Sequence, residues 1–231
     1  MRDEPSEIVI DKDIRILLRR MARARRMTLR VARAGGQVVL TMPPFVPLSE
    51  GRAFAQSRAG WLRRTRDAMP ARQAVAAGAL LPVQGRPLRI TPAPVATVRM
   101  QDGLLLVPDR HPAGPVLAAW LKQLARTRLA AACDRHAASI GRPYRAISLR
   151  DTRSRWGSCS HEGRLMFSWR LAMAPAAVLD YVAAHEVAHL RHMDHSPAFW
   201  DATARLMPDY RTHRQWLRDH GHELHSWLFS G

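Results

Sequence analysis

The chain has 231 residues, of which 47% are hydrophobic, so it can bury a core and form one large domain or two small ones. It contains no apolar run of 18 residues, and its charged N-terminus lacks an apolar signal core, so neither a membrane span nor export is expected. The formal net charge is +17, and all but two of the 36 Lys and Arg residues are arginines. This charge favours contact with polyanions, although an ordinary arginine-rich surface would look the same.

Residues 1–110 are predicted to form a β-rich N-terminal part. The strand-like segments 26–32 and 37–42 flank two glycines, a pattern typical of a hairpin. One helix is expected over residues 49–69, and short strands follow it between Gly and Pro signals.

A run of arginines precedes the hairpin and is the densest charge cluster in the chain. It is predicted to lie on an exposed segment. No recognised nucleic-acid motif accompanies it, so binding to nucleic acid and a solvated surface both remain open. Its members are Arg19, Arg20, Arg23, Arg25 and Arg26.

The composition changes at residues 108–115, and residues 111–231 are predicted to form a second domain. A helix of about 25 residues comes first. Strands are expected over 146–150 and 164–169, with residues 153–159 as the connecting turn.

The cysteines exclude two kinds of site. Cys133 and Cys159 are the two cysteines of the chain, and they lie far apart without forming a CxxC pair. This excludes a disulfide framework and a zinc site built from cysteines. Free thiols suit a reducing compartment, so a cytoplasmic location is expected.

The period becomes helical after Pro175, a favourable first residue because proline lacks the N–H that would have no partner there. Val182, His185 and His189 share one face of this helix, and further apolar residues line another. A helix that is apolar on more than one face is buried, so both histidines are expected inside the protein.

This helix carries the motif HEVAH, in which His185 and His189 are about one turn apart. Two imidazoles at this spacing can converge on one zinc ion. In H-E-x-x-H sites the glutamate, here Glu186, does not bind the metal and acts as a general base. The alternative is a pair of core histidines with satisfied hydrogen bonds.

A catalytic zinc site takes three protein ligands, and His195 is predicted to be the third. His192 shares the helix face of His185 but lies about 10 Å further along the axis, too far to close one tetrahedron. Ser196 and Pro197 start a new helix, so the chain must bend before them and carry His195 back. The spacing equals that of metzincins, but His192 replaces their glycine, so a different turn is expected. The carboxylate alternatives for the third ligand are Asp194, Asp201, Asp209, Asp219 and Glu223.

These motifs resemble the YgjP-like (SprT-like) zinc metallopeptidases over most of the chain. The matching segments are RSRWGSCS (153–160), YVAAHEVAHL (181–190), DHSPAFW (194–200) and MPDY (207–210). The resemblance implies that Zn2+ is bound by His185, His189 and His195 and that Glu186 is catalytic. Ser168 departs from the family, which usually has an asparagine before the tryptophan, and this puts a role for that amide in doubt.

The sequence therefore predicts an α+β, zincin-like metallopeptidase in which a short sheet lies over the HExxH helix. Its substrate would be a protein or peptide, whose backbone could pair along the strand at 163–169. SprT-like families include proteases that act on proteins attached to DNA, so weak, sequence-independent DNA binding is also expected. The alternative is a non-catalytic, zinc-containing nucleic-acid-binding module. Glu186 discriminates between the two functions. A structural zinc site fills its fourth position with a protein ligand, whereas a catalytic site leaves this position to the water on which the glutamate acts.

Overall fold

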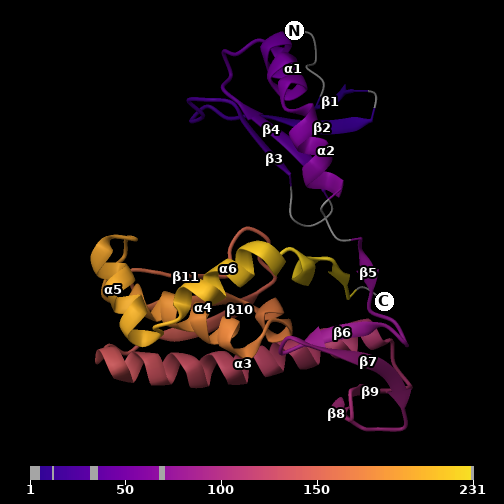
Figure 1. The fold of residues 1–231 in the computed structure, drawn as a ribbon, viewed down its shortest axis with the longest axis vertical. Helices are drawn as coiled ribbons and strands as arrows, with labels where there is room; N and C mark the ends of the chain where they lie inside the picture. The colour runs from indigo at the N-terminus through magenta and orange to yellow at the C-terminus, as the bar shows by residue number, and fades with distance from the viewer. Residues whose placement is uncertain (1–5, 12, 32–35, 68–70, 230–231) are drawn as a thin grey trace. The chain divides into compact units, whose positions relative to one another are not determined.

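The computed structural model describes residues 6–11, 13–31, 36–67 and 71–229. The chain falls into two compact units, Met1–Ala71 and Arg72–Gly231. Helices and strands occur in both, in agreement with the predicted α+β class (Figure 1). None of the described helices combines the length and apolar character needed to cross a membrane.

The first unit is a four-stranded sheet in the order β1-β2-β4-β3 with two helices packed on it. Alternation along the strands turns Ile14, Ile16 and Leu40 into the core, where each is 0% exposed. The predicted hairpin is confirmed, since β3 and β4 pair antiparallel with Leu29 opposite Leu40. The elements are β1 (Glu7–Ile10), β2 (Ile14–Arg20), β3 (Thr28–Val31), β4 (Val38–Met42), α1 (Leu48–Ser57) and α2 (Ala59–Asp67).

The helix expected over residues 49–69 is two helices. Arg58 interrupts it with φ −107° and ψ 5°, which lie outside the helical range. The interruption lets Ala55 of α1 and both Ala59 and Leu62 of α2 join the same buried cluster. Tertiary burial thus overrides a locally continuous helical pattern.

The arginine run is not uniformly free surface. Arg20 is half-buried, and its Nη1 donates hydrogen bonds to the carbonyl oxygens of Pro43, Pro44 and Val46 at 3.0, 2.8 and 2.8 Å. The other four arginines of the run are exposed, as predicted. Arg20 therefore fastens the proline-rich loop that leads from β4 into α1.

The second unit begins with strands that pack against its long first helix. Leu81, Ile90 and Leu105 of one sheet share a core with Leu117 and Leu121 of α3. The boundary between the two units therefore lies at residues 71/72 and not at 110/111, because these strands bury their apolar side chains against α3. The sheet order is β6-β7-β9-β8. The elements are β5 (Gln73–Ala74), β6 (Leu80–Val83), β7 (Arg86–Ala93), β8 (Arg99–Gln101), β9 (Leu104–Pro108) and α3 (Ala113–Ile140).

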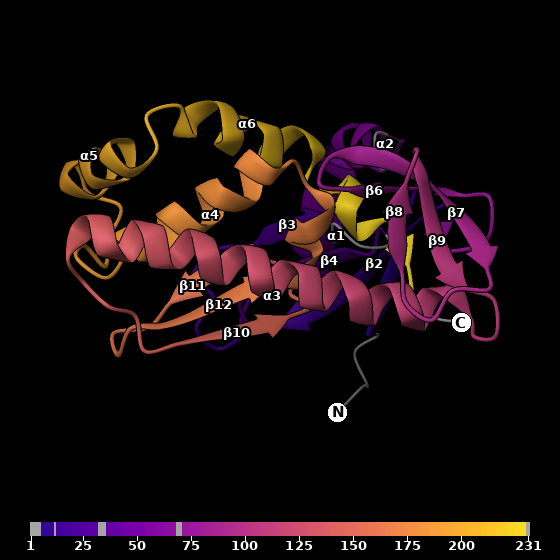
Figure 2. The same cartoon turned by 90° about the horizontal axis from the view of Figure 1, so that it is seen from below.

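The rest of the second unit surrounds helix α4. Helix α3 runs along the unit and contacts α4 and β10, while α4 also contacts α5, α6 and β11 (Figure 2). A three-stranded sheet has the order β10-β12-β11, and β13 pairs with β5. The elements are β10 (Ala146–Arg150), β11 (Gly157–Cys159), β12 (Arg164–Ser168), η1 (Trp169–Met173), α4 (Ala176–Ala188), α5 (Pro197–Leu206), α6 (Tyr210–His220), η2 (Glu223–His225) and β13 (Trp227–Leu228).

Candidate metal centre

Helix α4 carries two of the predicted site histidines through the core. Val178, Val182 and Val187 are at most 3% exposed, as expected for a helix packed on several sides. His185 lies in its last turn and is half-buried, and His189 follows as the C-cap residue and is 8% exposed. The burial predicted for this helix is confirmed.

The chain bends after α4 and brings His195 back to the pair. Helix α5 begins at Pro197 with Ser196 as its N-cap residue, although the Ser196 hydroxyl makes no capping hydrogen bond. The Nε2 atoms of His195 and His185 are 3.2 Å apart. One ring nitrogen from each of the three histidines lies within 4.8 Å of the others, the sole such His, Cys, Asp or Glu triad among the described residues.

This arrangement fits a metal ion bound by imidazoles. Zinc–nitrogen bonds of about 2.0–2.1 Å in a tetrahedral site separate two ligand nitrogens by about 3.3–3.4 Å. The separation between His185 and His195 is close to this value. The donor set is therefore chemically suited to zinc, for which imidazole is a common ligand.

Hydrogen bonding and burial keep ring nitrogens of His185 and His189 available as ligands. The Nδ1 atom of His189 lies 2.9 Å from the carbonyl oxygen of His192. A carbonyl only accepts, so Nδ1 donates and the lone pair remains on Nε2. Burial, with the neighbouring His189 and His195, lowers the pKa of His185 to about 3, and burial also lowers the pKa of His189. Neutral imidazoles are the form that binds metal.

Phe199 forms the apolar floor of the centre. This α5 side chain is 0% exposed, and its ring centroid lies 4.9, 4.4 and 4.8 Å from those of His185, His189 and His195. Contact with all three rings restricts their rotation. No sequence pattern predicted this contact, because a buried Phe in a short helix usually packs in the core alone.

Glu186 lies beside the histidines in an almost closed position. It is 5% exposed, and burial raises its pKa to about 8 against the opposing influence of the Arg155 charge. Strand β11 passes directly over its carboxyl. A Cβ atom added at Gly157 would lie 2.5 Å from Oε1 and 2.7 Å from Cγ of Glu186. Position 157 therefore accepts only a glycine while Glu186 keeps this conformation.

The WGSC stretch is thus more than a connecting turn. It contains β11, and its glycine marks a close approach of backbone to another group, which is one reason for a glycine inside a strand. Sequence reasoning missed Gly157 as a site residue, because nothing in the spacing shows what approaches it. Trp156, just before it, stacks on the buried His225 with ring centroids 4.9 Å apart.

The edge strand next to the site is β11. The strand at 163–169 corresponds to β12, which pairs with β10 in parallel and with β11 antiparallel. It lies in the middle of the sheet, so the expectation that it is the free edge is wrong. Among the described residues, β11 pairs with no strand on its other side.

The carboxylates considered as a third ligand lie outside the triad. Glu223 accepts a hydrogen bond from Nδ1 of His220 at 2.9 Å, and both side chains are about half exposed. Asp209 pairs with His213 at 3.0 Å on α6. These contacts engage both carboxylates away from His185 and His189.

Comparison with known proteins adds independent information. A structure of a metallopeptidase zymogen, abylysin from Pyrococcus abyssi, is similar to 39% of this chain and 93% of its own, with 16% identity and a TM-score of 0.36. No curated protein matched the chain. The family model for the YgjP-like metallopeptidase domain matches residues 25–220. Because this match spans most of both units, the chain belongs to the YgjP-like metallopeptidase family.

Proposed function

We propose that the protein is a zinc-dependent peptidase in which His185, His189 and His195 hold the metal and Glu186 is the general base. The observation that carries the proposal is the convergence of three imidazoles beside a buried carboxyl. Membership of a metallopeptidase family supports hydrolysis of peptide bonds.

Zinc, when bound, supplies Lewis acidity that polarises the scissile carbonyl and makes a nearby water molecule more acidic. Glu186 accepts the proton of the attacking water and delivers it to the leaving amine. A pKa raised to about 8 in the metal-free protein suits a group that must both take and release a proton near neutral pH. Phe199 excludes water from the inner side of the imidazoles and so keeps the local dielectric low.

The substrate backbone is expected to pair along the free side of β11. No described strand pairs with this edge, which lies over Glu186, so an extended peptide added there would bring its carbonyls near the centre. Such pairing reads the backbone more than the side chains and favours unfolded segments as substrates.

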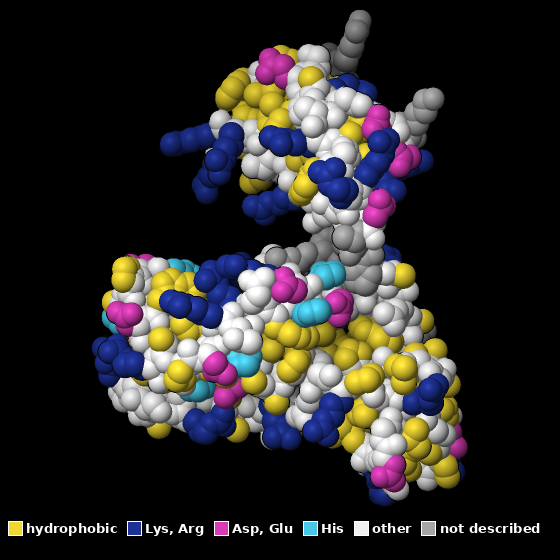
Figure 3. All heavy atoms as spheres, viewed as in Figure 1, with side chains coloured by type: hydrophobic (Ala, Val, Ile, Leu, Met, Phe, Trp, Pro, Cys, Tyr) yellow, Lys and Arg dark blue, Asp and Glu magenta, His cyan; other side chains and the backbone are white. Residues whose placement is uncertain are grey.

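The competing function is a zinc-containing module that binds nucleic acid without catalysis. Lys and Arg side chains are spread over the face drawn in Figure 3 and do not gather in one patch. DNA binding therefore stays a prediction, and it is expected to be weak and salt-sensitive. The buried Glu186 beside the triad favours the peptidase.

The test is a peptidase assay on an unfolded protein, with zinc content measured in parallel. Glu186→Gln should keep about one zinc per chain and lose at least about 10²-fold in kcat/KM, because an amide cannot accept the proton. Glu223→Gln, which changes an exposed glutamate in the same way, is the matched control and should remain active. His195→Ala should lose zinc.

Two outcomes would contradict the proposal. Equal activity of Glu186→Gln and wild type would remove the general-base role. Loss of zinc in Glu223→Ala with retention in His195→Ala would show that the third ligand is wrongly assigned.

A further inference from the structure

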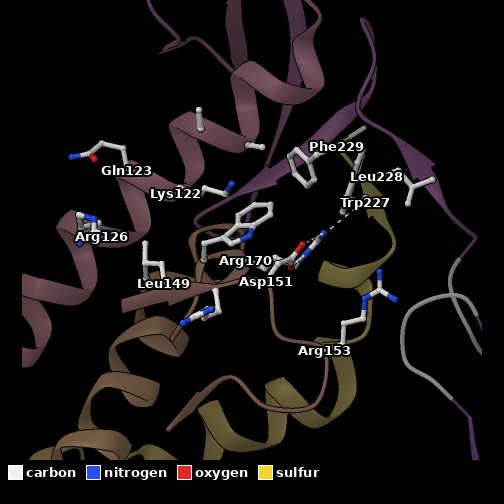
Figure 4. A pocket seen from close by; sticks show the side chains of 14 residues that line it. Lys122, Gln123, Arg126, Leu149, Asp151, Arg153, Arg170, Trp227, Leu228 and Phe229 are labelled. Atoms are coloured by element: carbon white, nitrogen blue, oxygen red, sulfur yellow. Dashed lines mark hydrogen bonds and ion pairs between the residues drawn. The ribbon is translucent and has the colours of Figure 1, made fainter. Parts of the chain in front are cut away.

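A cavity of about 750 Å³ in the second unit shares no residue with the metal centre. It is bounded by α3, by the end of β10 with the loop that follows, and by residues 227–229. Figure 4 shows the α3 side chains on one side of it and the residues 227–229 on another. Its volume lies within the range of about 300–1,000 Å³ that is typical of ligand pockets.

The floor of this cavity is rigid and electrically balanced. Arg170, which is 9% exposed, contacts both oxygens of Asp151 at 2.6 and 3.2 Å. Its Nη1 also donates to the carbonyl oxygens of Leu224 and Trp227 at 2.9 and 3.1 Å. Asp151 is the single acidic residue in the lining, and Arg170 neutralises it.

Four further cations line the cavity without a counter-charge. All four are exposed, and none has an ion pair or side-chain hydrogen bond with any described residue. They are Lys122, Arg126, Arg150 and Arg153. Lys122 and Arg126 are four residues apart on α3, a spacing at which like charges repel each other. Lys122 has one aromatic neighbour, since its Nζ lies 5.8 Å from the ring centroid of Trp169.

We infer that this cavity binds a small anion that carries two or more phosphate groups. Four unpaired positive charges in one concavity require several negative charges in a small volume. A phosphate chain meets this requirement, because each group carries charge on several oxygens that guanidinium groups bind in pairs. An acidic peptide spreads its charges along a backbone that would also have to fit between α3 and residues 227–229.

The probe for this inference is inorganic tripolyphosphate, titrated calorimetrically into the zinc-loaded, full-length protein at low ionic strength. The pocket variant combines Lys122→Gln, Arg126→Gln and Arg153→Gln. The control variant removes the same charge from three exposed arginines of the same unit outside the cavity, through Arg86→Gln, Arg99→Gln and Arg110→Gln.

Wild type should bind about one tripolyphosphate per chain. The pocket variant should bind at least about tenfold more weakly, since it loses three charged hydrogen-bond donors. The control variant should stay within about twofold of wild type. Equal weakening of both variants would show that only the overall charge acts, and no binding to wild type would show that the cavity does not hold such an anion. Either result would overturn the inference.

Tripolyphosphate also chelates zinc, so a further variant separates the two sites. His195→Ala alters the metal centre and leaves the cavity lining unchanged, so it should bind the probe as wild type does. Loss of binding in His195→Ala would place the anion at the metal centre and refute the inference. A hexaglutamate peptide that binds more tightly than tripolyphosphate, and loses affinity in the pocket variant, would refute the choice of phosphate.

Discussion

Gly157→Ala is the substitution that most directly examines the contact between β11 and the proposed general base. The added methyl would lie 2.5 Å from Oε1 of Glu186. Ordinary contact between such atoms needs about 3.2–3.5 Å, so either the strand or the carboxylate must move by about 0.7–1 Å. Gly157 is not among the residues with positive φ, so alanine adds no backbone strain and the clash alone acts.

The expected result is a loss of activity without a loss of metal. A displacement of about 1 Å in a catalytic group can cost about 10²-fold in rate, and overpacking should lower the free energy of unfolding by about 1–3 kcal/mol. The three atoms nearest to the new methyl all belong to Glu186, so the protein should retain about one zinc per chain. The measurements are kcat/KM on an unfolded protein substrate, zinc content and denaturant unfolding.

The matched control is Ser158→Ala on the same strand, which removes an oxygen without adding a methyl over Glu186. A double variant sharpens the test. In a Glu186→Gln background, Gly157→Ala should cause little further loss of activity, because the group that it displaces no longer functions. Activity of Gly157→Ala within about threefold of wild type, or a parallel loss of zinc and activity, would refute the reasoning.

Two further substitutions or conditions give separate tests. Phe199→Ala should lower zinc affinity about 10–100-fold and the free energy of unfolding by about 3–5 kcal/mol, because it empties a fully buried position that contacts all three imidazoles. Competition with a chelator would measure the zinc affinity. An unchanged affinity would show that the Phe199 ring does not position the histidines. Burial raises the pKa of Cys133 to about 12 and that of Cys159 to about 11, and the charge of Glu186 contributes to both shifts. Both thiols should therefore be protonated at pH 7 and react slowly with iodoacetamide, with a rate that grows about tenfold per pH unit up to the pKa; mass spectrometry would follow this, and rapid labelling of Cys159 at pH 7 would contradict it.

The parts of the site that the sequence predicted are those that local patterns encode. The helical period with two apolar faces predicted that α4 is buried, and the four-residue spacing predicted that His185 and His189 lie on one side of it. The Ser196-Pro197 signal marked the start of α5, and this start required a bend that returns His195 to the pair. Each of these signals lies within a few residues of its consequence.

The parts that escaped prediction depend on contacts between segments far apart in the chain. Strand β11 lies within the segment that was expected to be a turn. It has only three residues, all half-buried, so the sequence shows no alternation of apolar and polar residues there. The approach of Gly157 to Glu186 joins positions 29 residues apart, and no local propensity reports it. The boundary between the units differs from the expected one for the same reason, since only packing shows that residues 80–108 cover α3.

Charge in this protein has to be assigned side chain by side chain. Arg20 belongs to the run that suggested DNA binding, yet its Nη1 binds three loop carbonyls and supports the first unit. The cavity of the second unit shows the opposite case, in which cations four residues apart line a hollow whose single acidic residue, Asp151, is paired with Arg170. A net charge of +17 therefore includes structural, solvated and binding-competent cations together. A variant that tests DNA binding should neutralise the exposed members of the run and keep Arg20, because its removal would release the loop and confuse loss of charge with loss of structure.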